Sequence, residues 1–215
     1  MKFRPIAVLF TIALALCATA ASASVIGFSS RYSTQGPLAS AADYRNTVNA
    51  LTAVAPTAGY CDRSLGLFDG INNGGQCGGG NSDVAFHFQI DFNAVASDFW
   101  SFRAGVDFGR GGAMFLDGNA LAFSDQDMWW NYDYANTAGV LQASGINVGA
   151  GNHVLDIYGL EGCCDGGQQG QFQIGNGNWA TFSARDGQDP VRVPAPATLA
   201  LLGAGLVGMG WRRGK

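Results

Sequence analysis

The amino-acid sequence predicts a mainly β protein, an antiparallel β-sandwich of the jelly-roll type with one short N-terminal helix. Three observations lead to this fold class. The stretch VAFHFQIDF, residues 84–92, alternates apolar and polar side chains with a period of two, which is typical of a half-buried antiparallel strand. Further short apolar stretches follow at intervals set by turn residues, a spacing that favours a sandwich. The 215 residues include 32 glycines and are only 13% charged, which favours strands and turns over helices.

The first 23 residues have the features of a secretory signal peptide. Lys2 and Arg4 provide a basic start, an apolar core follows, and Ala21-Ser22-Ala23 provides the small residues that precede a cleavage site. We therefore expect an exported protein with a signal peptide over 1–23 and a folded domain over 24–185.

Residues 40–54 are expected to form the helix. Ser40 and Asp43 make a pair that resembles a capping box at its start. The apolar residues at helical spacing are Tyr44, Val48 and Leu51. The glycine-rich stretch 58–83 that follows is predicted to be a loop, and it is too long to stay unpinned in a compact domain.

Strands are predicted to dominate the rest of the domain. They are expected over 84–92, 99–108, 113–118, 119–123, 128–134, 153–160, 171–175 and 179–184. The side chains expected inside the sandwich are Phe86, Phe88, Ile90, Phe102, Leu155 and Ile157. A polar, proline-containing linker over 186–193 then leads to the C-terminal segment.

Four cysteines remain after the signal peptide: Cys61, Cys77, Cys163 and Cys164. An even number in an exported chain favours disulfides, and the adjacent pair lacks the spacing of a zinc site, which is the alternative. Adjacent Cα atoms lie about 3.8 Å apart, whereas a disulfide usually needs roughly 4.4 to 6.8 Å. We therefore favour bonds from Cys163 and Cys164 back to Cys61 and Cys77. The alternative is a Cys61–Cys77 bond with the adjacent pair reduced or strained.

The C-terminal segment 194–215 predicts a transmembrane helix. An apolar run from about Ala197 to Trp211 is closed by basic residues, and its length is slightly short for a bilayer core of about 30 Å. Pro194-Ala195-Pro196, the apolar run, and then Arg212 and Arg213 resemble the PEP-CTERM sorting signal of bacteria that make exopolysaccharide.

This resemblance covers about the last two dozen residues and departs from the family at Ala195, where the family usually has Glu. It implies an exosortase-type processing enzyme as a partner, and a membrane anchor through the C-terminal helix. The expected location is then the cell surface or the extracellular matrix. A plain C-terminal anchor is the alternative.

A second resemblance involves three stretches, residues 100–118, 146–167 and 171–183. Together they are similar to the sugar-binding β-sandwich shared by protective antigen and yeast flocculins. In flocculins, two adjacent aspartates before a glycine bind calcium, which coordinates sugar hydroxyls; here only Asp107 of Asp107-Phe108-Gly109 matches that pair. Cys163-Cys164-Asp165-Gly166 is similar to the CCxG signature of a subgroup of PEP-CTERM proteins.

The charge of the domain argues against nucleic acid as a partner. The terminal segments contain five of the 12 basic residues and none of the 16 acidic ones, so seven arginines face 16 acids and the remainder has a net charge of −9. Such a surface repels phosphate backbones. It would suit cations or an extracellular polysaccharide.

The sequence contains candidates for glycan or calcium contact but no catalytic motif. Asp107 and Asp117 could supply the oxygen ligands that calcium prefers. Trp129 and Trp130, with the tyrosines after them, could stack on sugar rings. We therefore expect a structural or glycan-binding matrix protein, not an enzyme, without a cofactor unless calcium binds. The alternatives are a secreted glycan hydrolase, for which Glu161 and Asp165 are the candidate carboxylates, and a surface protein without glycan contact.

Overall fold

The computed structural model describes residues 24–188, so the predicted signal peptide, the end of the linker and the C-terminal segment lie outside the described residues. Three helical segments occur in this part of the chain: α1 (Ala41–Thr52), α2 (Asn73–Cys77) and the 3-10 turn η1 (Thr137–Gly139). The strands are β1 (Val25–Tyr32), β2 (Asp62–Leu65), β3 (Val84–Ala94), β4 (Asp98–Gly105), β5 (Asp107–Phe108), β6 (Gly112–Leu116), β7 (Asn119–Ser124), β8 (Met128–Trp129), β9 (Val140–Val148), β10 (Gly151–Glu161), β11 (Gln169–Ile174) and β12 (Ala180–Thr181).

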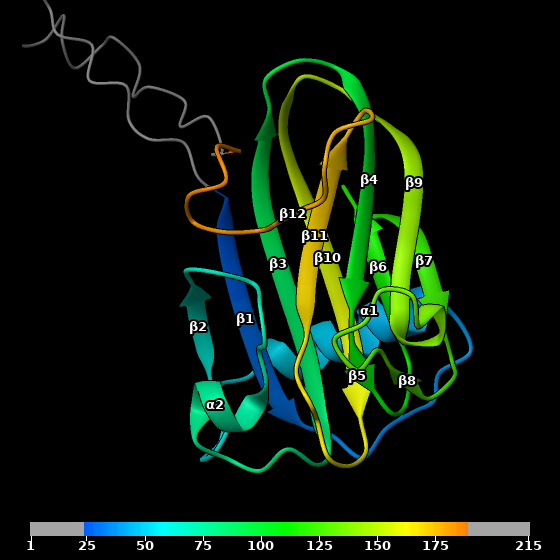
Figure 1. Cartoon of the computed structure of the whole chain (residues 1–215). Helices are drawn as coiled ribbons and strands as arrows, with labels where there is room; N and C mark the ends of the chain where they lie inside the picture. The colour runs from blue at the N-terminus through cyan, green and yellow to red at the C-terminus, as the bar shows by residue number, and fades with distance from the viewer. Residues whose placement is uncertain (1–23, 189–215) are drawn as a thin grey trace, which may run out of the picture.

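Ten of these strands form two facing antiparallel sheets and β5 pairs with β8 in a third, two-stranded sheet, which confirms the predicted mainly β fold (Figure 1). The larger sheet has the order β2-β1-β3-β10-β6-β7, and the smaller has the order β12-β11-β4-β9. Aromatic and aliphatic side chains from both sheets fill the space between them. All six residues predicted for this core are at most 1% exposed: Phe86, Phe88, Ile90, Phe102, Leu155 and Ile157.

Three predicted strands are shorter than expected, and one of them, 179–184, is a strand only at Ala180–Thr181. The stretch 99–108 divides into β4 and β5 at Val106. The stretch 128–134 is a strand only at Met128–Trp129, because Asn131 and Tyr132 adopt φ values of 52° and 57°, which no β-strand tolerates. Strands β1, β2 and β9 are additions that the sequence did not predict.

Helix α1 begins at its predicted cap, where the Ser40 side chain accepts a hydrogen bond from Asp43 N. It packs against the outer face of the larger sheet and contributes the buried side chains of Tyr44 and Val48 to a second, smaller apolar cluster. The Tyr44 hydroxyl donates to Arg110 O at 2.6 Å. In Figure 1, α1 lies behind the larger sheet and the smaller sheet lies in front of it.

The predicted disulfide connectivity was wrong. Cys61 is bonded to Cys77, with their Cα atoms 5.5 Å apart, and Cys163 is bonded to its neighbour Cys164. Helix α2 brings Cys77 back beside Cys61, so the glycine-rich loop closes on itself. The expected link between this loop and the 162–167 turn does exist, but hydrogen bonds make it: Asn73 N donates to Asp165 Oδ2 at 2.9 Å.

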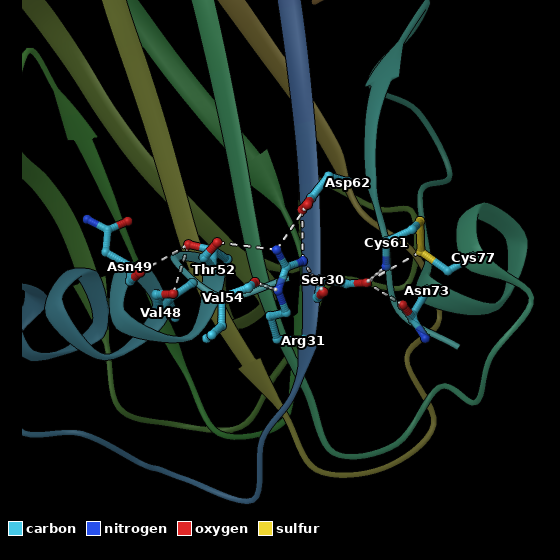
Figure 2. A network of polar contacts seen from close by, with 10 residues as sticks. All are labelled: Ser30, Arg31, Val48, Asn49, Thr52, Val54, Cys61, Asp62, Asn73 and Cys77. Carbon is cyan, nitrogen blue, oxygen red and sulfur yellow. Dashed lines mark hydrogen bonds and ion pairs between the residues drawn. A yellow bond between two sulfur atoms is a disulfide. The ribbon is translucent and has the colours of Figure 1, made fainter. Parts of the chain in front are cut away.

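Arg31 on β1 joins the end of α1 to strand β2 (Figure 2). Its guanidinium donates to both carboxylate oxygens of Asp62, at 2.8 and 3.0 Å, and to the carbonyls of Thr52 and Val54. These carbonyls belong to the last turn of α1 and the residues after it, whose carbonyls have no partner within the helix. Hydrogen bonding from Arg31 also holds the pKa of the Asp62 carboxyl below its usual range.

The neighbouring residue, Ser30, reaches the opposite side of β1. Its hydroxyl donates to Asn73 Oδ1 at 2.6 Å and accepts from Cys61 N at 3.2 Å. Figure 2 shows both side chains between α1 and the disulfide. Two consecutive residues of β1 thus connect this strand to three segments: the end of α1, the Cys61–Asp62 segment and Asn73 of α2.

We expect Arg31→Ala to lower the free energy of unfolding by about 2 to 4 kcal/mol, because the side chain is 93% buried and its loss leaves several carbonyl acceptors unpaired. Urea unfolding of the purified protein measures the effect. The matched control is Arg63→Ala, which removes an exposed arginine bonded to Gln76 O and should cost less than about 1 kcal/mol. Equal losses in the two variants would contradict a special role for Arg31.

Candidate functional site

The candidate site lies at the end of the sandwich where β5 and β8 pair. Asp107 is opposite Trp129 in this pair, and Phe108 is opposite Met128. Phe108 and Met128 point into the core, whereas the Trp129 side chain is 57% exposed. The pairing therefore places the exposed indole next to a largely buried carboxylate, since Asp107 is 8% exposed.

The turn between β10 and β11 closes over this pair. Gly166 N donates to Asp107 Oδ2 at 2.6 Å, and the Tyr132 hydroxyl donates to Gly166 O at 2.7 Å. A Cβ atom at Gly166 would lie 2.7 Å from Asp107 Oδ2 and 4.0 Å from Trp129 Nε1, so only glycine allows this approach. Asp107, Trp129, Tyr132 and Gly166 form what we call the end site.

Trp130, the other predicted tryptophan, is an internal anchor. It is 2% exposed, and its Nε1 donates to Gly167 O at 3.1 Å. Its ring lies on Gly105, where a Cβ atom would be 2.2 Å away. Trp130 therefore fixes the segment that carries Trp129 and Tyr132, and it is not available to a ligand.

Two further carboxylates lie buried behind the end site. Glu161 is 1% exposed and accepts from Gly109 N and Cys163 N, each at 2.6 Å. Asp165 is 3% exposed and accepts from Asn73 N and from Gln168 Nε2. Burial raises the pKa of Glu161 to about 7 and that of Asp165 to about 6. Burial also raises the pKa of Asp107.

Both buried carboxylates accept hydrogen bonds from main-chain N–H groups of the turns around them. Glu161 and Asp165 are the candidate carboxylates of the hydrolase alternative, and both are buried. Gln168 is fully buried, and its Nε2 donates to Asp165 Oδ1 at 2.6 Å while its Oε1 has no hydrogen-bond partner. The buried acids therefore position the Gly166 turn against Asp107.

The structure places Asp117, the remaining predicted contact, away from this end. Asp117 occupies the β6–β7 turn with a φ of 50° and accepts from Val154 N, while His153 Nδ1 lies 2.7 Å from its other carboxylate oxygen. Strand β6 separates it from Asp107. Among residues 24–188, no three or more His, Cys, Asp or Glu side chains come together in a way that could hold a metal ion.

Cys163 and Cys164 are exposed on the same turn, next to the end site. Cys164 has a φ of 76°, in the left-handed region that favours glycine. The sequence indicated this doublet with Gly166 as a motif and Tyr132 as an aromatic candidate, but it did not predict that the Gly166 turn contacts Asp107 and Tyr132, because those contacts join residues distant in the chain.

Comparison with known families identifies the C-terminal segment. Residues 192–214 match the PEP-CTERM protein-sorting motif. The chain carries a PEP-CTERM sorting signal. This motif is the signal recognised in exosortase-type processing, and it indicates export and anchoring of the C-terminus in the membrane. No helix within residues 24–188 is long and apolar enough to cross a membrane.

The fold of the domain is similar to that of solved β-domains. A structure described as the PA14 sugar-binding domain from an RTX adhesin matches with a TM-score of 0.53 and 13% identity, over 78% of this chain and 99% of that one. An anti-sigma factor domain-containing protein matches with a TM-score of 0.51 and 11% identity, over 80% of this chain and 50% of that one. No curated protein matches the chain. At these identities the similarity establishes the fold, as the second resemblance predicted.

We expect the buried carboxylates to make stability depend on pH. Because the folded pKa values of Glu161 and Asp165 lie above those of an unfolded chain, the folded state binds protons more tightly. The resulting stabilisation is fully present below about pH 4 and is lost as the pH rises through 6 and 7. The change should be on the order of a few kcal/mol.

Urea unfolding at half-unit steps between pH 4 and pH 8 measures this dependence. Glu161→Gln cannot ionise, so the slope of the unfolding free energy between pH 5 and pH 7 should become smaller in that variant. An unchanged slope would show that Glu161 does not titrate in this range.

Proposed function

We propose that this protein is an exported component of the cell surface or of an extracellular exopolysaccharide matrix, and that it binds glycans through the end site. We further propose that it is not an enzyme and needs no cofactor for this binding. The observation that carries the proposal is the exposed Trp129 indole opposite the Asp107 carboxylate. An aromatic face binds the apolar face of a sugar ring, and a carboxylate accepts hydrogen bonds from its hydroxyls.

The surroundings of these two groups support the proposal. Gly166 N donates a hydrogen bond to one oxygen of Asp107. Trp129 lies directly before Trp130, whose buried side chain anchors this segment to Gly167 O. Both groups are therefore oriented before a ligand arrives, which lowers the entropy lost on binding. The similarity to a domain described as sugar-binding agrees with this function. The sorting signal would present such a domain outside the cell.

The arrangement at Asp107 supports binding without calcium. The residue after it is Phe108, which is buried in the core and offers no second carboxylate. Asp117 lies on another turn and is already bonded to Val154 N. Binding of glycan should therefore survive removal of calcium.

We expect Trp129→Ala to weaken glycan binding by at least about tenfold, since truncation of a central aromatic contact typically costs more than about 1.4 kcal/mol. A glycan array with the purified protein, followed by titration calorimetry on the best ligand, measures this. The control is Tyr32→Ala, which removes an aromatic side chain of similar exposure, 55%, on β1. Both variants should fold as the parent does.

Four outcomes would count against the proposal. Equal affinities of the two variants would show that the glycan does not bind at the end site. Loss of binding in the presence of a chelator would indicate that calcium is needed. Release of shorter sugars from the bound glycan would favour the hydrolase. The absence of any glycan bound by the parent protein would leave a surface protein without glycan contact.

Processing of the tail gives a separate prediction. Protein recovered from the native host should lack the residues beyond roughly Pro196, because an exosortase-type enzyme removes the anchor at the sorting signal. Intact-mass spectrometry of the exported protein shows this directly. Retention of Trp211, Arg212 and Arg213 on the bulk of the protein would leave a plain membrane anchor, with Ala195 as the departure that explains the lack of cleavage.

A further inference from the structure

The outer face of the smaller sheet has an unusual composition for so acidic a domain. Along β4, Trp100, Phe102 and Ala104 point into the core, so the side chains that alternate with them point outward. The same alternation applies to β11 and β12, and to β9 on each side of the irregular pairing near Trp100. The outward side chains at the centre are Ser101, Arg103, Gln142, Gln171, Gln173 and Thr181, which we call the amide face.

Strand register aligns four of these residues across the whole sheet. Arg103 is directly opposite Gln142 on one side and Gln171 on the other, and Gln171 is opposite Thr181. Neighbouring strands are about 4.8 Å apart, so this row extends over roughly 14 Å. A row of amides, a hydroxyl and a guanidinium presents both hydrogen-bond donors and acceptors along a line.

Arg103 is held rigidly at the centre of the row. Its guanidinium carbon lies 3.7 Å from the ring centre of Tyr134 and 4.1 Å from that of Trp179. Its Nε and Nη2 donate to Gln171 Oε1 at 2.8 and 2.5 Å. Two rings and one amide thus fix a planar cation that matches the geometry of a carboxylate.

The charge pattern of the four strands favours an anionic ligand. Apart from Asp98 at the start of β4, Arg103 is the only charged residue in β4, β9, β11 and β12. The remainder of the domain has a large excess of carboxylates, which would repel an anionic polymer. The amide face is therefore a region on which such a polymer meets a cation and no central carboxylate. No helix among the described residues covers this face, whereas α1 covers the outer face of the larger sheet (Figure 1).

We propose that the amide face is a second binding site, separate from the end site, for an extended polysaccharide that carries carboxylates. A uronate carboxylate binds Arg103, and neighbouring sugar hydroxyls bind Gln142, Gln171 and Thr181 along the row. The face is planar and crosses the sheet, so it takes an internal segment of a chain, in contrast to the single exposed ring of the end site.

The test uses the full chain in detergent micelles, with polygalacturonate as the probe and its methyl ester as the uncharged form of the same polymer. The parent should bind polygalacturonate at least about tenfold more tightly than the ester. Gln142→Glu places a carboxylate beside Arg103 and should weaken binding of polygalacturonate by about tenfold or more. Arg103→Ala should also weaken binding of polygalacturonate. It removes the contacts of Arg103 to Tyr134 and Trp179 as well, so Gln142→Glu is the more specific test.

The matched control is Asn46→Glu, which adds the same charge on an exposed position of α1. Two sheets, roughly 10 Å apart, separate this position from the amide face, and that spacing exceeds the Debye length of about 8 Å at physiological ionic strength. Asn46→Glu should therefore leave the affinity within about twofold. Trp129→Ala should also leave it unchanged, because the end site is a different surface.

Several results would overturn this site. Equal weakening by Gln142→Glu and Asn46→Glu would indicate attraction by overall charge, and binding of polyglutamate as tightly as polygalacturonate would indicate an acidic peptide as the partner. Loss of binding in Trp129→Ala but not in Gln142→Glu would assign the polymer to the end site, and the proposed function would then stand without a second site. A parent that binds neither form of the polymer would refute the amide face, while the glycan array tests the end site separately.

Discussion

The buried carboxylate of Asp165 is the contact on which the arrangement of the end site depends. It accepts hydrogen bonds from Asn73 N, Gly167 N and Gln168 Nε2, and so joins α2 to the turn between β10 and β11. From Asn73 the connection continues to Ser30 on β1, and from Gln168 to the Asp107 carbonyl. A buried polar network is most stable when every member has a partner, so each of these segments constrains the next.

This network has a cost that the rest of the fold must offset. Glu161 and Asp165 remove two carboxylates from water, and Gln168 Oε1 remains without a partner. Burying such groups typically costs a few kcal/mol even when most hydrogen bonds are made. The apolar core between the sheets supplies the compensating stability. The end of the sandwich thus gives up stability to hold Gly166 and Asp107 in one arrangement.

The sequence predicted what depends on local alternation and missed what depends on distant partners. The period of β3 was visible in its own residues, so its core side chains, such as Phe86 and Ile90, could be named in advance. Strand β9 could not be predicted in this way, because Gly145 and the irregular pairing near Trp100 interrupt its alternation of apolar and polar residues. The link from Asp165 to Asn73 joins residues 92 positions apart, and an aspartate in a glycine-rich turn ordinarily signals only the turn. The disulfide prediction was wrong for the same reason: it assigned to cysteines a connection that hydrogen bonds make.

The last described residues and the end site lie at opposite ends of the sandwich. Gln188, the last described residue, accepts a hydrogen bond from Asn93 N at the end of β3, and Asp186 accepts from Ser24 N nearby. The opposite end of β3 pairs with Glu161, directly before the turn that carries Gly166. Since β3 has 11 residues and a strand rises about 3.3 Å per residue, about 35 Å separates the exit of the chain from the end site. The described part of the chain therefore ends at the end of the sandwich opposite Trp129. The amide face lies along the side between these ends, so the two proposed sites occupy separate surfaces, and a ligand on one need not block the other.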